Sequence, residues 1–242
     1  MRIYVNTDAL ATAFAGMTFT LPEAQAHHVG RVMRRRAGDS LSLFDGHGHE
    51  WAATLTSVER KRVEVCLDAP ITPVSESPLT VHLGQAISKG DRMDIAIQKS
   101  VEMGVTEITP LYTARGDVRL RSEREAKKLA HWQAVATSAC EQCGRATLPR
   151  IHPPCLLDDW LSAREETLRL VLQPGTSALE QHTAPETVAL LIGPEGGFNT
   201  EEIERAKDNH FGTLALGPRV LRTETAPIAA LALLQFLYGD LR

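Results

Sequence analysis

Residues 190–206 read LLIGPEGGFNTEEIERA, where an apolar run ends in a glycine-rich turn and an acidic, helix-like stretch follows. This order predicts a buried strand, a turn at its carboxyl end, and a helix capped by Asn199 together with Glu202. In α/β sheets, ligands bind at the carboxyl ends of the strands. The turn is therefore a candidate binding loop.

The turn differs from the common phosphate-binding loops. A P-loop has Lys and Ser or Thr after its last glycine, where this chain has Phe198 and Asn199, and the pattern G-x-G-x-x-G is absent. Glu195 lies inside the turn, and its carboxylate would repel a phosphate. The expected ligand lacks phosphates and offers donors or positive charge, as S-adenosylmethionine does. The alternative is a plain βα connection in which glycine serves only for tight turning.

Two further strand ends favour a pocket. LGPRVLRTETAP, residues 216–227, also follows an apolar strand and opens a helix, and LVLQPG ends a strand near Leu172. Loops at the same edge of a sheet can enclose one ligand. The sequence predicts that these three turns build a single site.

The organisation of the chain changes at a proline-rich segment, APITPVSESP, residues 69–78. The part before it is mostly β, with one helix that Thr20 and Glu23 open as a capping box and that runs to about Met33. The part after it alternates strands and helices, which indicates an α/β domain with a mostly parallel sheet. We expect an N-terminal domain over 1–70, a linker over 71–78 and a second domain over 79–242.

Composition limits the function classes. The chain has 242 residues, of which 43% are hydrophobic and 23% charged, as in ordinary soluble proteins. It has no uninterrupted apolar stretch of membrane-spanning length, and its start does not resemble a secretory signal, so a cytoplasmic location without membrane association is expected. The net charge is −4, so any RNA-binding surface must be local. The arginines at 31 and 34–36 are candidates for one, although a solvated charged face is the alternative.

Several motifs resemble a known family. GPEGGFNTEEI (193–203) followed by LGPRVLRTETA (216–226) closely resembles the RsmE-type enzymes of the SPOUT class of knotted methyltransferases. HHVGRVMRRRAGD (27–39) and LFDGHG (43–48) are similar to the family's RNA-binding segment. The stretches 89–111 and 139–151 resemble its first strand-and-helix unit and its long-helix exit. The resemblance covers nearly the whole chain.

The resemblance implies a fold and an activity. The expected fold is α/β, a SPOUT-type trefoil-knotted methyltransferase domain preceded by a PUA-like β-barrel domain. The expected reaction is transfer of a methyl group from S-adenosyl-L-methionine to N3 of a uridine in 16S rRNA of the small ribosomal subunit, by a homodimer. Two alternatives stay open: a related knotted methyltransferase acting on tRNA or 23S rRNA, and a catalytically silent RNA-binding protein of the same fold.

The resemblance also assigns residues. Arg222 and Glu224 are the catalytic candidates, Arg222 as a stabiliser of the anionic uracil and Glu224 as the proton acceptor. An Arg–Glu pair that only fixes the loop is the alternative for both. The expected cofactor-binding residues are Leu172, Gly193, Glu195, Gly196, Leu216, Gly217, Leu221, Arg222 and Thr225. The expected RNA-binding residues are His28, Arg31, Arg34, Arg35, Arg36 and Arg115. Gly116 departs from the serine that many members have after this arginine.

The sequence also contains a pattern that is typical of metal sites. Cys140, Cys143, His152 and Cys155 give C-x2-C followed by H-x2-C, a spacing seen in zinc sites. The first two cysteines lie on an expected amphipathic helix, and prolines separate the other pair. Buried thiols are the commoner outcome in the cytosol. We expect no metal, while the sequence leaves binding by these four residues open.

Overall fold

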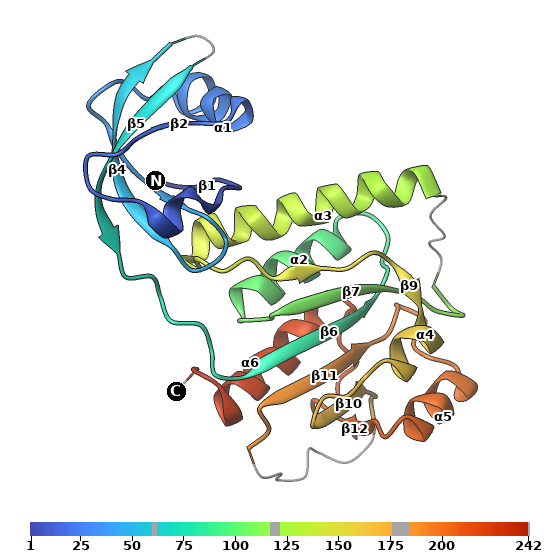
Figure 1. Cartoon of the computed structure of the whole chain (residues 1–242). Helices are drawn as coiled ribbons and strands as arrows, with labels where there is room; N and C mark the ends of the chain where they lie inside the picture. The colour runs from blue at the N-terminus through green and yellow to red at the C-terminus, as the bar shows by residue number, and fades with distance from the viewer. Residues whose placement is uncertain (60–61, 117–121, 176–183, 242) are drawn as a thin grey trace. The chain divides into compact units, whose positions relative to one another are not determined.

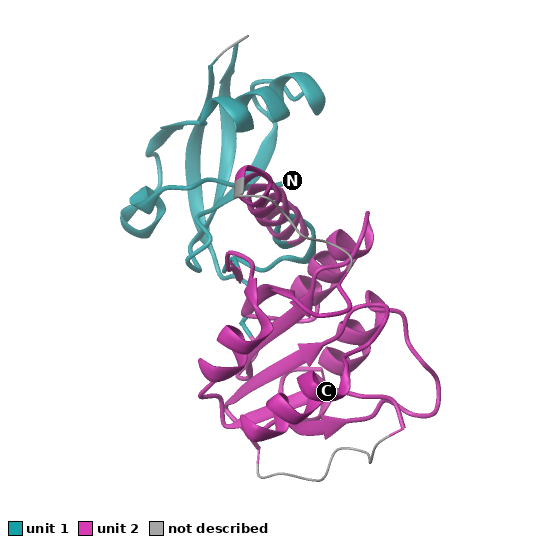
Figure 2. Cartoon of the chain, turned by 90° about the vertical axis from the view of Figure 1, so that its right-hand side faces the viewer, with its two compact units in different colours: residues 1–76, 140–148 teal, residues 77–139, 149–242 magenta. Residues whose placement is uncertain are grey.

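The computed structural model describes residues 1–59, 62–116, 122–175 and 184–241, in the element order of Figure 1. The chain divides into two compact units. The N-terminal unit contains residues 1–76 together with 140–148, and the C-terminal unit contains residues 77–139 together with 149–242 (Figure 2).

The N-terminal unit is built on a five-stranded sheet in the order β1-β3-β4-β5-β2. β1 pairs with β3 in parallel, and the other neighbours are antiparallel. Inward-facing aliphatic side chains of the strands form the core with Leu10, Ala26 and Val29. The strands are β1 (Arg2–Tyr4), β2 (Thr18–Thr20), β3 (Ser40–Phe44), β4 (Glu50–Val58) and β5 (Val63–Ile71).

The predicted helix of this unit forms, but its predicted cap is wrong. α1 (Glu23–His27) continues as a π-helical turn over His28–Val32. Pro22 is the N-cap and makes no side-chain cap hydrogen bond. Thr20 belongs to β2, where it pairs with Glu64 of β5. Strand pairing therefore outweighs the local capping pattern.

A short segment from far along the chain belongs to the N-terminal unit. Thr147 forms β-bridges with Gly46 and His47. Arg2 donates through Nη1 to the carbonyl of Cys140 at 2.5 Å and through Nη2 to the carbonyl of Arg145 at 3.2 Å. The N-terminal unit is thus discontinuous in sequence.

Glu50 anchors the buried polar cluster of this unit. Arg2 donates to both of its carboxylate oxygens, through Nε at 2.9 Å and Nη2 at 2.8 Å, and Ser42 donates its hydroxyl at 2.8 Å. Burial raises the pKa of Glu50, but the hydrogen bonds from Arg2 and Ser42 lower it more, so the net pKa lies below the ordinary 4.5. The carboxylate form is favoured by folding.

This lowered pKa predicts a pH dependence of stability. The contribution of Glu50 is complete above the unfolded-state pKa and is lost as pH falls below about 4.5, because the unfolded chain then takes up the proton more readily. Near neutral pH, Glu50→Gln should lower the free energy of unfolding by about 1.5–3 kcal/mol, the range of a hydrogen bond to a charged group. Urea unfolding between about pH 3 and pH 7 measures the difference between wild type and variant, which should shrink on acidification. A difference that stays constant across this range would contradict the prediction.

The C-terminal unit contains a sheet in the order β12-β10-β11-β6-β7-β8, with β9 paired to β7. Every pairing is parallel, as the sequence predicts. The strands are β6 (Thr80–Ala86), β7 (Glu107–Tyr112), β8 (Arg150–Ile151), β9 (Cys155–Leu156), β10 (Leu168–Leu172), β11 (Thr187–Ile192) and β12 (Gly212–Leu214).

Helices cover this sheet. Side chains of α4 and α5 share one apolar cluster with strand residues such as Val171 and Leu191. α2 and α6 pack against each other, and Gln235 of α6 donates to the carbonyl of Met103 that ends α2. The helices are α2 (Arg92–Glu102), α3 (Ser122–Cys143), α4 (Leu157–Ser162), α5 (Thr200–Asp208) and α6 (Thr225–Tyr238), and the last turn of α3, from residue 140, belongs to the N-terminal unit. Among the described helices, none has the length and apolar character of a membrane span.

Candidate functional site

A depression opens at the carboxyl edge of the parallel sheet, where β10, β11 and β12 end. Its volume is about 680 Å³, within the range of about 300–1,000 Å³ usual for small-molecule sites. Its walls come mainly from residues 172–174, the turn 192–198 and the loop 216–226, with Arg92 from the start of α2 and Arg115 from the loop after β7. The three strand-end turns that the sequence singled out therefore do line one pocket.

The structure brings most of the expected cofactor-binding residues together. The pocket is lined by Leu172, Gly193, Glu195, Gly196, Leu216, Gly217, Leu221 and Arg222, and by Glu224 and Arg115. Thr225 is not among the lining residues. It begins α6, and its amide donates to the carbonyl of Arg222 at 2.9 Å.

Side chains within and just after the turn that follows β11 fix its conformation. A Cβ at position 193 would lie 3.0 Å from the ring of Phe198, so the close approach of this ring favours glycine. Asn199 accepts from the amide of Glu202 at 2.7 Å, and Glu202 accepts from the amide of Asn199 at 2.9 Å, which is the predicted capping box. This reciprocal pair sets where the turn ends and α5 begins.

The loop after β7 fixes the same turn from another direction. Glu202 is buried, and its second oxygen accepts from the amide of Ala114 at 2.7 Å. Arg115 donates through Nη1 to the carbonyls of Gly196 at 3.0 Å and Phe198 at 3.4 Å. The guanidinium expected to contact RNA thus also supports the backbone of the pocket.

Thr223 joins the two main loops of the pocket. Its buried hydroxyl donates to the carbonyl of Gly193 at 2.9 Å and accepts from Gln85 Nε2 at 3.1 Å. Gln85 lies on the central strand β6, so the link continues into the sheet. A hydroxyl with both partners satisfied in a buried place restrains the geometry of both loops.

Charged groups lie around the pocket. Glu195 pairs with Arg92, with Arg92 Nη1 at 2.7 Å from Glu195 Oε1, and this contact raises the pKa of the guanidinium. Both side chains are well exposed, so the pair contributes little to stability. Oε2 of Glu224 is buried without a hydrogen-bond partner in the described part of the chain. No ion pair joins Arg222 to Glu224 there, so the loop-fixing pair is not what the structure holds.

Sequence reasoning missed three of these residues. Gln85 lies near the end of β6, Arg92 begins α2, and Thr223 stands between the two catalytic candidates. The strand-end rule that identified the other loops applies equally to the end of β6. The position of Thr223 in the quoted loop was the only sign of its role.

The expected RNA-binding residues of the N-terminal unit lie on its surface. His28, Arg31, Arg34 and Arg36 are exposed, and Arg35 is half-buried, with Nη1 3.9 Å from Asp39 Oδ2. Arg34 has a positive φ of 52°, which marks the turn after the helical segment. These side chains form a local basic surface within an acidic protein.

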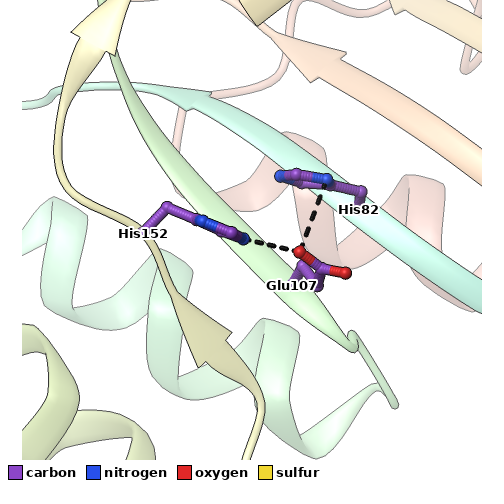
Figure 3. Close-up of side chains that lie close together, drawn as sticks. All are labelled: His82, Glu107 and His152. Carbon is purple, nitrogen blue, oxygen red and sulfur yellow. Dashed lines mark hydrogen bonds and ion pairs between the residues drawn. The ribbon is translucent and has the colours of Figure 1, made fainter. Parts of the chain in front are cut away.

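The four residues of the cysteine pattern are divided between the two units. Cys140 and Cys143 belong to the N-terminal unit, whereas His152 and Cys155 belong to the C-terminal unit, and all four cysteines of the chain are free of disulfides. Within the described part, the group of at least three metal-ligating side chains with closely spaced donor atoms is instead His82, Glu107 and His152 (Figure 3).

Comparisons with known families agree with this architecture. The profile of the RNA methyltransferase domain matches residues 75–235, and that of the RNA methyltransferase PUA domain matches residues 21–66. These matches confirm the expected α/β methyltransferase fold with an N-terminal PUA-like domain.

Individual proteins match over nearly the full length. Proteins named ribosomal RNA small subunit methyltransferase E from Buchnera aphidicola and Bacillus subtilis are 36% and 31% identical, each aligned over 92% of this chain and over 92% and 93% of their own lengths. A methyltransferase from Legionella pneumophila, solved with SAM bound, is 43% identical with a TM-score of 0.94 over 99% of this chain and 98% of its own. The ribosomal RNA small subunit methyltransferase E of Neisseria gonorrhoeae, bound to S-adenosyl methionine, is 38% identical with a TM-score of 0.91 over 100% and 99%. The chain belongs to the ribosomal RNA small subunit methyltransferase E family of RNA methyltransferases.

Proposed function

We propose that this protein transfers a methyl group from S-adenosyl-L-methionine to N3 of a specific uridine in 16S rRNA of the small ribosomal subunit. The observation that carries the proposal is the pocket formed by the three strand-end turns. All of the residues that the family resemblance assigns to the cofactor except Thr225 line it. Two similar structures bind this cofactor, and the relatives are named for small-subunit ribosomal RNA.

The donor set of the pocket suits this cofactor. Glu195 and Glu224 contribute carboxylates, and one oxygen of Glu224 is buried without a partner among the described residues. A carboxylate attracts an ammonium or a sulfonium. Leu172, Leu216 and Leu221 offer apolar walls for an adenine ring. When bound, the cofactor supplies an electrophilic methyl group.

Arg222 and Glu224 have complementary roles on the uracil ring in this proposal. N3 of uracil carries a proton at neutral pH and becomes nucleophilic when that proton leaves. Glu224 accepts the proton, directly or through a water molecule. Arg222 stabilises the negative charge that then spreads over the ring. Thr223 fixes the backbone between them through its bond to Gly193.

RNA binding combines both units in the proposal. His28 and the arginines at 31 and 34–36 provide phosphate contacts, which position an RNA without reading its sequence. Arg115 uses one nitrogen for the loop carbonyls, and a guanidinium has five N–H donors, so contact with an RNA phosphate is compatible with this support.

A homodimer and a cytoplasmic location complete the proposal. α2 and α6 pack together and leave Ile95, Phe236 and Leu237 exposed. Exposed apolar side chains on adjacent helices suit a protein–protein contact. The substrate is cytoplasmic in this proposal because ribosomal subunits are.

Mapping methylated nucleosides tests the activity directly. Small ribosomal subunits, 23S rRNA and tRNA from a strain lacking this gene are incubated with the protein and labelled cofactor, and the products are digested and analysed by mass spectrometry. One N3-methyluridine gained in 16S rRNA supports the proposal. A mark in tRNA or 23S rRNA would identify the related knotted methyltransferase instead. Binding of RNA without binding of S-adenosylmethionine in calorimetry would indicate the silent protein.

A further inference from the structure

A second cluster of functional side chains lies at the amino-terminal edge of the same sheet, away from the pocket at its carboxyl edge. His82 of β6 and Glu107 at the start of β7 are paired residues of neighbouring strands, and His152 follows β8 directly. Figure 3 shows the three side chains pointing toward one another. We propose that His82, Glu107 and His152 bind a divalent first-row transition ion, with Zn²⁺ as the ion to be tested.

The spacing of the donor atoms fits such an ion. His152 Nε2 lies 2.5 Å and His82 Nδ1 lies 3.8 Å from Glu107 Oε2, and all three donors lie within 4.8 Å of one another. Ligands about 2.0–2.2 Å from a tetrahedral zinc ion are about 3.3 Å apart. To bind the ion, the 2.5 Å separation between His152 and Glu107 must therefore lengthen and the 3.8 Å separation between His82 and Glu107 must shorten, each by less than an ångström. Two imidazoles and one carboxylate are also a donor set typical of zinc.

His82 is oriented for ligation through Nδ1. Arg164, which is always protonated, contacts Nδ1, so this nitrogen presents its lone pair. His82 Nε2 lies 2.8 Å from the hydroxyl of Thr109 and 3.4 Å from Trp160 Nε1, and these two contacts fix the orientation of the ring. In metal sites, the ring nitrogen of a histidine that does not bind the ion usually contacts a neighbouring polar group, which holds the ring in place.

Arg164 is the cation that competes for this place. Its Nη1 lies 2.9 Å from Glu166 Oε1, and its guanidinium lies over the ring of Trp160 at 5.0 Å. A metal ion at His82 has to displace the Nη1 contact. That displacement frees Glu166, whose Oε1 is 3.5 Å from His82 Nδ1, to become a fourth ligand. The affinity for the ion is thus limited by the guanidinium.

Zinc titration of the full chain tests the site. Protein freed of metal with a chelator is titrated with Zn²⁺ in competition with a chromophoric chelator, which gives stoichiometry and Kd. His152→Asn and Glu107→Gln each remove one ligand without opening the core, since both side chains are only half-buried. Each should raise Kd by more than about 100-fold, beyond the 10–100-fold effect of an outer partner. Arg164→Gln should lower Kd by about tenfold or more, because it removes the competing charge.

A matched control separates this site from other zinc ligands of the chain. His131 and Asp94 form another His–carboxylate pair, with 2.6 Å between Nε2 and Oδ2 and no third ligand in the described residues, so His131→Asn should leave Kd unchanged. Circular dichroism verifies that each variant is folded. Absence of zinc binding by the wild type would overturn the proposal. Equal affinity in the wild type and both ligand variants would also overturn it, because the zinc would then bind elsewhere, for example at the free thiols. Tighter binding by a folded Arg164→Gln variant that is lost again when Glu107→Gln is added supports the site independently.

Discussion

Replacing Arg222 by alanine is expected to lower the rate of methyl transfer by about 10²–10³-fold, the usual effect of removing one donor that stabilises a developing anion. The expectation rests on the proposed function. Arg222 is exposed in the pocket, and its side chain makes no hydrogen bond or ion pair within the described part of the chain. Its loss should therefore leave the fold unchanged. The measurement is single-turnover methylation of small ribosomal subunits with saturating cofactor.

Arg219 supplies the control for this prediction. It lies in the same loop, is exposed and also lines the pocket. Arg219→Ala should mainly weaken substrate binding, whereas Arg222→Ala should act on the turnover number at saturating substrate. Affinity for S-adenosylmethionine, measured by calorimetry, should change little in Arg222→Ala. Wild-type turnover in that variant would remove Arg222 from the chemistry.

Trp160→Ala is expected to lower the free energy of unfolding by about 3–5 kcal/mol, the range for deleting a large buried aromatic ring. Trp160 is only 3% exposed and packs its ring against Phe211 and the edge of His82. A Cβ at position 84 would lie 2.7 Å from the indole, so β6 has a glycine where this ring lies on the sheet. The neighbouring side chains cannot fill the space of an indole without moving the strand.

Urea unfolding followed by circular dichroism measures the loss, since the variant also changes the fluorescence. Leu156→Ala is the control, because Leu156 is 55% exposed at the start of the same helix. Surface substitutions of this kind usually change stability by less than about 0.5 kcal/mol. A loss of under about 1 kcal/mol in Trp160→Ala would show that the ring does not support the sheet.

Local patterns predicted the elements that form the pocket. The strand, turn and helix of residues 190–206 appear as expected, and Asn199 with Glu202 forms the capping box. These features depend on residues a few positions apart, whose physical chemistry is readable from the sequence. The convergence of three strand-end turns followed from the parallel sheet.

Features that depend on distant residues were not predictable. Arg92 pairs with Glu195 across 103 positions, and Gln85 meets Thr223 across 138. Thr20 and Glu23 show the opposite case. Their spacing predicted a capping box, but Thr20 instead pairs with a residue of β5 in the sheet. β8 and β9 have two residues each, too few for a period-2 pattern to be recognised. The roles of the basic residues in the N-terminal unit remain predictions.

The two-part composition of the N-terminal unit has a consequence for the order of events during protein synthesis. Its five strands have all left the ribosome when residue 76 emerges, yet the bridges of Thr147 to Gly46 and His47 and the acceptors of Arg2 come from residues 140–148. Domains usually fold in the order in which they are made. The first unit therefore cannot be completed, and Arg2 lacks part of its hydrogen bonds, until residues 77–139 of the second unit and then 140–148 have been translated. A fragment that ends at the proline-rich segment would never complete it.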